Sequence, residues 1–170
     1  MPKRYSSIEG RVYVALELAR VQKFSKAQRV VRGLTNATLG SSSLRLVAQV
    51  HNRCDDLEAA EECWKEIESR GDMTSGDYYM LGTIRSQCSK YEAAVQCYER
   101  EIDLASKSEE RYFFSSSVIR LADLLIQLGR LEQAKEVLSF IDDDEGEFLN
   151  GYGYQKKRDL LQRIDDKVAQ

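Results

Sequence analysis

The four cysteines repeat at a fixed interval, and this regularity constrains the fold more than any other feature of the sequence. Cys54 and Cys88 are 34 residues apart, and so are Cys63 and Cys97. Self-similarity at a period of about 20–50 residues is typical of solenoids and other repeat architectures. The cysteines therefore predict duplicated structural units, in which cysteine fills a small apolar space.

The same interval aligns the sequence on both sides of each cysteine. Glu92-Ala93-Ala94 falls on Glu58-Ala59-Ala60, and apolar residues match on either side of this triplet. Related patterns occur upstream and downstream, with an insertion expected around Lys107–Tyr112 before the last unit. The alignment predicts four repeat units, over residues 8–40, 41–74, 75–108 and 115–147.

Each unit has the pattern of two amphipathic helices joined by a short turn. In the fourth unit, Val118, Leu121, Ala122 and Leu125 follow the spacing that places side chains on one helical face. The only proline is Pro2, so no proline interrupts the later helices. A single helical hairpin cannot bury its apolar face alone, whereas stacked hairpins bury a continuous core.

The third unit resembles the tetratricopeptide repeat, in which aromatic, leucine, glycine and alanine residues stand at set positions; here they are Tyr78, Leu81, Gly82, Tyr91, Ala94 and Tyr98. The resemblance implies an all-α, right-handed α-solenoid of antiparallel helix hairpins, as one domain over residues 1–170. The third unit departs from the family at Glu101, where a small apolar residue is usual.

The C-terminal segment predicts a further helix outside the four units. Gly151 and Gly153 indicate a bend, and residues 153–169 then carry an apolar stripe surrounded by charges. A solenoid needs a helix with a polar outer face over its open end, so we interpret this segment as a capping helix. The alternative is an amphipathic helix held out for a partner.

Motifs for catalysis and metal binding are absent from the sequence. His51 is the only histidine, no CxxC pair occurs, and we interpret His51 as a packing residue. We therefore predict no enzyme activity, no metal site and no cofactor. No secretion signal or apolar span is evident, which predicts a cytoplasmic protein that does not enter the membrane.

In the tetratricopeptide repeat family, the first helices of successive units line a concave groove. Carried onto this chain, the resemblance implies these groove residues: Tyr13, Arg20, Arg45, Gln49, Asn52, Arg53, Tyr79, Met80, Thr83, Gln87, Arg120 and Asp123. Four are arginines and one is acidic, so we expect an extended or helical partner segment with acidic or C-terminal carboxylate groups. The lysine and asparagine clamp that grips chaperone tails in one subgroup is not reproduced.

The function predicted from these features is a non-enzymatic protein-interaction module, acting as an adaptor, assembly subunit or dedicated binding partner. A small bacterial secretion chaperone or toxin-immunity protein is an alternative within this class. A helical-repeat RNA-binding protein is an alternative of another class, which the net charge of −3 disfavours. Self-association through the first unit or the terminal helix is a third possibility.

Overall fold

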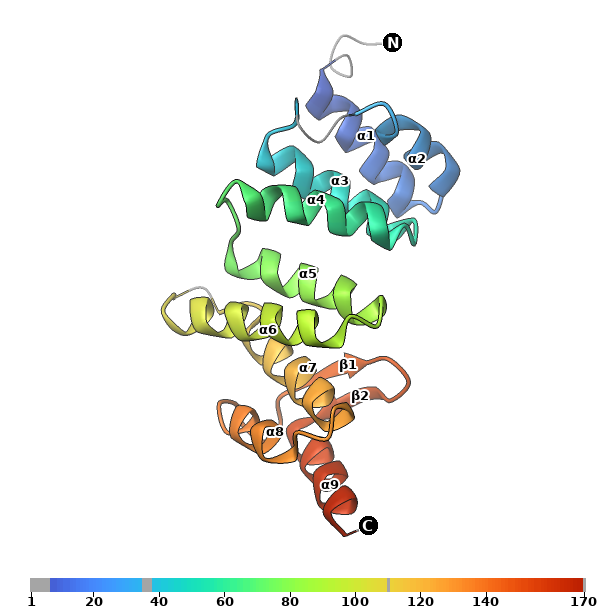
Figure 1. The fold of residues 1–170 in the computed structure, drawn as a ribbon. Helices are drawn as coiled ribbons and strands as arrows, with labels where there is room; N and C mark the ends of the chain where they lie inside the picture. Colours follow the sequence, from blue (N-terminus) through green and yellow to red (C-terminus); the bar gives the residue numbers. More distant parts are fainter. Residues whose placement is uncertain (1–6, 35–37, 110, 170) are drawn as a thin grey trace. The chain divides into compact units, whose positions relative to one another are not determined.

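The computed structural model describes residues 7–34, 38–109 and 111–169. The chain forms two compact units, Met1–Met73 and Thr74–Gln170. The first unit contains two helical hairpins, shown in blue to green in Figure 1. Its helices are α1 (Ile8–Arg20), α2 (Phe24–Val31), α3 (Ser41–Arg53) and α4 (Leu57–Ser69).

The second unit also begins with two helical hairpins. They are formed by α5 (Ser75–Gln87), α6 (Tyr91–Ser106), α7 (Phe114–Gln127) and α8 (Leu131–Leu138). A β-hairpin of β1 (Gly146–Leu149) and β2 (Gly153–Lys156) follows, and α9 (Lys157–Val168) is the last helix. The order α1 to α8 matches the four predicted units of two helices each.

The turn inside each hairpin repeats in detail. One residue of each turn has a left-handed backbone conformation, with φ of 59° at Gln22, 59° at Asp55, 58° at Ser89 and 76° at Gly129. The amide of the following residue bonds back to a carbonyl five residues earlier in all four turns, as in Lys90 N to Arg85 O at 2.8 Å. This hydrogen bond closes the end of a helix when the residue just before the donor has a left-handed conformation. The four hairpins are thus in phase in the backbone as well as in the sequence.

Small residues let the two helices of a hairpin approach closely. In the third hairpin, a Cβ atom added to Gly82 would lie 2.9 Å from Cε1 of Tyr98 and 3.1 Å from Cβ of Cys97. Ala48 is fully buried at the equivalent position of the second hairpin. Helix α6 has 16 residues where α4 has 13, so it is extended up to Ser106, directly before the insertion expected near Lys107–Tyr112.

The expectation of a helix over residues 153–169 is wrong at its start. Residues 153–156 form β2, which pairs antiparallel with β1 so that Phe148 lies opposite Tyr154. Gly151 and Gly153 have positive φ and supply the turn. The helix begins only at Lys157, where the carboxylate of Asp159 accepts the backbone N–H of Lys156 at 2.8 Å. This hydrogen bond satisfies a donor at the helix start.

Helix α7 forms the centre of the second unit. It contacts α6, α8, α9 and β1, and Figure 1 shows it lying among these elements. Every residue from Leu121 to Ile126 is buried. Leu160 and Ile164 of α9 are fully buried in the same apolar cluster. The β-hairpin and α9 therefore cover surface of α7 that four plain repeats would leave open.

Candidate functional site

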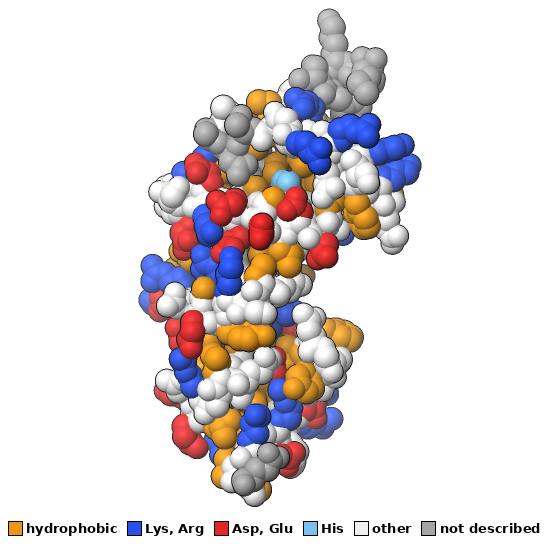
Figure 2. Space-filling model, turned by 45° about the vertical axis from the view of Figure 1, so that its right-hand side comes forward, with side chains coloured by type: hydrophobic (Ala, Val, Ile, Leu, Met, Phe, Trp, Pro, Cys, Tyr) orange, Lys and Arg blue, Asp and Glu red, His pale blue; other side chains and the backbone are white. Residues whose placement is uncertain are grey.

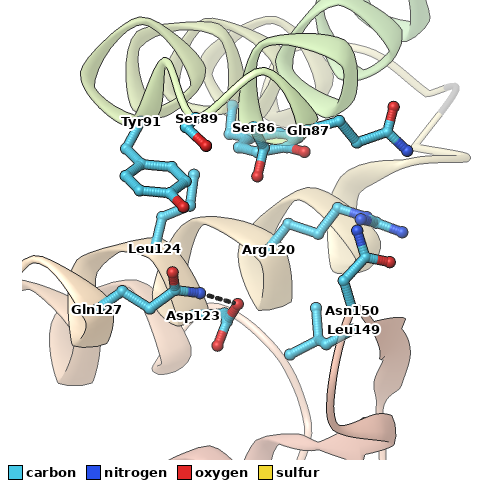
Figure 3. A pocket seen from close by; sticks show the side chains of 11 residues that line it. Ser86, Gln87, Ser89, Tyr91, Arg120, Asp123, Leu124, Gln127, Leu149 and Asn150 are labelled. Atoms are coloured by element: carbon cyan, nitrogen blue, oxygen red, sulfur yellow. Dashed lines mark hydrogen bonds between the residues drawn. The ribbon is translucent and has the colours of Figure 1, made fainter.

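A polar pocket of about 280 Å³ lies in the second unit, where the C-terminal end of α5 and the side of α7 meet the turn of the β-hairpin. Figure 3 shows the side chains of Gln87, Arg120 and Asn150 at one end, with Tyr91, Leu124 and Gln127 at the other. Its full lining is Ser86, Gln87, Ser89, Tyr91, Tyr98, Arg120, Asp123, Leu124, Gln127, Leu149 and Asn150.

Arg120 is held in place by groups of the protein. Its Nε donates to the hydroxyl of Tyr79 at 3.1 Å, and its Nη2 donates to the carbonyl of Phe148 at 3.2 Å. Nη2 also pairs with Oε1 of Glu147 at 3.4 Å, and the side chain is 19% exposed. The β-hairpin therefore fixes an arginine that the sequence alone would leave free.

The tyrosines behind Arg120 are neutral hydroxyl groups at physiological pH. Burial raises the pKa of Tyr98 to about 12, and its hydroxyl lies 3.2 Å from Oγ1 of Thr83. Burial also raises the pKa of Tyr79, an effect that Arg120 opposes. Burial lowers the pKa of Arg120, but Tyr98, Tyr79 and Glu147 together raise it above its ordinary value, so the guanidinium stays charged.

Asp123 is the second charged group of the pocket, and it is also paired. It is 7% exposed. Its Oδ1 accepts from Nη2 of Arg163 on α9 at 2.8 Å, and its Oδ2 accepts from Gln127 at 2.8 Å. The two charged pairs, Arg120 with Glu147 and Asp123 with Arg163, leave the pocket close to electrically neutral.

The structure brings together half of the predicted groove residues of the second unit. Gln87, Arg120 and Asp123 line the pocket, whereas Tyr79 and Thr83 support it from behind. Met80 is half-buried and does not line the pocket. Arg120 and Asp123 are also paired within the protein, Arg120 with Glu147 of the β-hairpin and Asp123 with Arg163 of α9, and their role in a groove stays a prediction.

The pocket also contains residues that sequence reasoning missed. Tyr91 and Tyr98 were identified only as residues of the repeat pattern, and Leu149 and Asn150 belong to the unforeseen hairpin. The left-handed Gly151 next to Asn150 was a usable signal for a tight turn. Nothing in the local pattern indicated that this turn packs beside α5 and α7.

In the first unit the predicted residues lie on α1 and α3. Tyr13 is 58% exposed beside a hollow of about 410 Å³, lined by Tyr13, Val14, Glu17, Leu18 and Val21. Arg20 is exposed and pairs with Glu17 at 3.6 Å, and Arg53 is also exposed.

On α3, Arg45 donates to the backbone carbonyl of Asp72, so it is held within the unit. Gln49 and Asn52 are half-buried. His51 makes a contact within the unit, because its Nδ1 lies 3.1 Å from Oδ2 of Asp56.

Charge is separated on the surface of the first unit. Lysine and arginine side chains gather over α1 and α2, and acidic side chains gather over α4 (Figure 2). Residues 7–34 carry six basic and two acidic side chains, whereas residues 55–72 carry eight acidic and two basic ones. The basic end is thus suited to attract an acidic partner.

Within residues 7–34, 38–109 and 111–169, no group of three or more His, Cys, Asp or Glu side chains is placed to hold a metal ion. In the same part of the chain, none of the helices combines the length and apolar character needed to span a bilayer. All four cysteines are free thiols.

Comparison with known proteins shows the class of this chain. Residues 78–108 and 115–139 match the family model of the tetratricopeptide repeat. The crystal structure of MamA has a TM-score of 0.64 and 11% identity, over 96% of this chain and 82% of that one. The sequence matches no curated protein.

A second similar structure is that of nearly identical TPR-like repeats from a putative kinesin light chain of Podosopora anserina. It has a TM-score of 0.65 and 14% identity, over 99% of this chain and 98% of that one. At such identities the likeness concerns the fold alone. The chain therefore carries tetratricopeptide repeats and has the all-α solenoid fold of that class, which is generally a protein-interaction module.

Proposed function

We propose that the chain is a non-enzymatic protein-interaction module that holds an extended segment of a partner protein against its first helices. The observation that carries this proposal is the pocket of the second unit, where Gln87 of α5 and Arg120 of α7 meet Asn150 of the hairpin. A concave site with some apolar lining and a few convergent polar groups is typical of a binding site. The four free thiols fit a reducing compartment such as the cytoplasm.

The first unit supports a partner segment with acidic character. Arg20 and Arg53 are exposed cations on α1 and α3, and residues 7–34 are positively charged overall. Arg45 and Arg120 support this preference less, because both donate hydrogen bonds within the protein. A test of the acidic preference should therefore change Arg20 and Arg53 and leave the two internal arginines intact.

The experiment selects peptides from a random displayed library on the full chain and measures their affinity by calorimetry. We expect acidic peptides that bind Arg20→Glu/Arg53→Glu at least about tenfold more weakly, since charge reversal replaces attraction by repulsion. The matched control is Arg100→Glu/Arg158→Glu, which makes the same change of charge at exposed positions of α6 and α9, outside the basic residues 7–34. Equal losses in the two double variants, or no peptide selected at all, would show that the groove is not the binding surface.

A further inference from the structure

We propose that the pocket of the second unit binds a glutamine or asparagine residue of the partner segment, in preference to a charged residue. This inference rests on the proposed function and adds the chemical class of the group that the pocket accepts. It is carried by the volume, the charge balance and the unpartnered polar groups of the pocket.

The volume limits the occupant to a small group. At about 280 Å³, the pocket lies just below the range of ~300–1,000 Å³ that is typical of sites for drug-sized ligands. Its accessible lining is mostly polar, and Leu124, Leu149 and the ring of Tyr98 supply a smaller, largely buried apolar part. A side chain with a short aliphatic stem and a polar end fits this arrangement.

The charge balance excludes an ionic occupant. Arg120 is paired with Glu147, and Asp123 is paired with Arg163 at 2.8 Å. A partner carboxylate at Arg120 would compete with Glu147, and an ammonium group at Asp123 would compete with Arg163. Either ion would lose its hydration without gaining an unpaired counter-charge, which is unfavourable in a partly buried site.

The remaining polar groups of the pocket are neutral. Among the residues that the structure describes, the side chains of Ser86, Gln87, Ser89 and Asn150 have no hydrogen-bond partner; Ser86 is half-buried and the other three are exposed at the rim, so a ligand can reach them. Gln87 and Asn150 lie at the same end of the pocket in Figure 3. Amide and hydroxyl groups both donate and accept hydrogen bonds, and a primary amide on the partner does the same. Glutamine and asparagine are therefore the side chains that can pair with this rim and leave no charge unpaired.

The test titrates the ¹⁵N-labelled full chain with N-acetyl-glutamine N-methylamide, and separately with the glutamate and lysine analogues. For a ligand of this size we expect a dissociation constant on the order of 1 mM or weaker. The backbone amide signals of Gln87, Arg120 and Asn150 should shift in a saturable manner with the glutamine compound. The charged analogues should bind at least about fivefold more weakly.

A charge-matched pair of variants locates the effect. Gln87→Glu/Asn150→Asp places two carboxylates on the rim and should weaken binding of the glutamine compound at least about fivefold. Gln96→Glu/Gln133→Glu adds the same charge at exposed positions of α6 and α8 and should leave it unchanged.

The inference is overturned if the three amide signals do not move by 50 mM ligand, or if the glutamate analogue binds as tightly as the glutamine compound. Equal weakening by both double variants would also overturn it. Peptides selected on the full chain that still bind the Gln87→Glu/Asn150→Asp variant would show that the proposed function stands and that only the role of this pocket is wrong.

Discussion

Glu101 shows how one residue departs from the pattern of its repeat and how the fold accommodates it. It stands on α6 with 0% of its surface exposed, and its Oε1 accepts a hydrogen bond from Ser75 of α5 at 3.0 Å. Burial raises the pKa of Glu101, an effect that the hydrogen bond from Ser75 opposes. The folded protein thus favours the neutral carboxyl more than the unfolded chain does.

Because the pKa of Glu101 differs between the folded and the unfolded chain, the free energy of unfolding depends on pH. The folded pKa of Glu101 exceeds the unfolded value of about 4.3, so its contribution to the free energy of unfolding is largest below pH 4.3. That contribution falls as the pH rises through the folded pKa. We expect Glu101→Gln to raise the free energy of unfolding at pH 8 by about 1 kcal/mol.

Urea unfolding of both proteins between pH 4 and 8 measures this effect. Glu99→Gln, at an exposed position of the same helix, is the control and should leave the pH dependence unchanged. The interpretation fails if Glu101→Gln keeps the pH dependence of the parent protein.

Gly82 allows close contact between α5 and α6, and its substitution should be costly. An added Cβ would lie 2.9 Å from the ring of Tyr98, which is 1% exposed and cannot move freely. Although alanine favours helix, we expect Gly82→Ala to lower the free energy of unfolding by about 1–3 kcal/mol. Gly40→Ala, where nothing lies within 4 Å of the new Cβ, is the control for thermal unfolding. A Gly82→Ala variant as stable as the control would argue against tight helix packing here.

At the scale of the element, the hairpin turns share one geometry but not one residue type. Ser89 has φ of 58°, a conformation in which the serine Cβ atom has a steric cost. Glycine has no Cβ atom and avoids this cost. We expect Ser89→Gly to raise the free energy of unfolding by about 1 kcal/mol, and Gly129→Ser, at φ of 76°, to lower it by a similar amount. Urea midpoints of the two variants check this, and changes of the same sign in both would contradict it.

Helix α9 is an integral part of the second unit. Leu160 is fully buried in the apolar cluster around α7. Nζ of Lys135 on α8 lies 3.7 Å from Oδ1 of Asp165 on α9. We expect Leu160→Ala to lower the free energy of unfolding by about 2–4 kcal/mol through the cavity it leaves. Hydrogen exchange should quicken in α7 and α9, whereas Arg158→Ala, on the exposed face, should leave it unchanged. Unchanged protection of α7 in Leu160→Ala would instead favour an α9 that is held out for a partner.

At the scale of the whole molecule, the second of the two compact units has an apolar core of its own. The second unit has a continuous apolar cluster that runs from Ala94 to Ile164 and includes α9. We expect a fragment of residues 74–170 to fold on its own, with a helical circular dichroism spectrum and a cooperative urea transition. A fragment that unfolds without cooperativity would show that this cluster is insufficient by itself.

The repeats were predictable because their signals are local and recur in phase. Apolar residues at helical spacing define each helix, and the 34-residue interval of the cysteines defines the unit. Gly82 and Tyr98 stand at set positions of the repeat pattern, and the structure places them against each other. The groove residues were chosen by analogy with the family, and their binding role stays a prediction.

The sequence by itself thus determined the helical hairpins, since helical periodicity indicates each helix and the 34-residue interval indicates how the helices group into repeats. Only the tertiary structure decided the chemistry of the pocket. Strands of four residues carry little periodic signal. The pairs Asp123 with Arg163 and Arg120 with Glu147 join residues 40 and 27 positions apart. Such contacts depend on how the β-hairpin and α9 pack on α7, which no local pattern specifies.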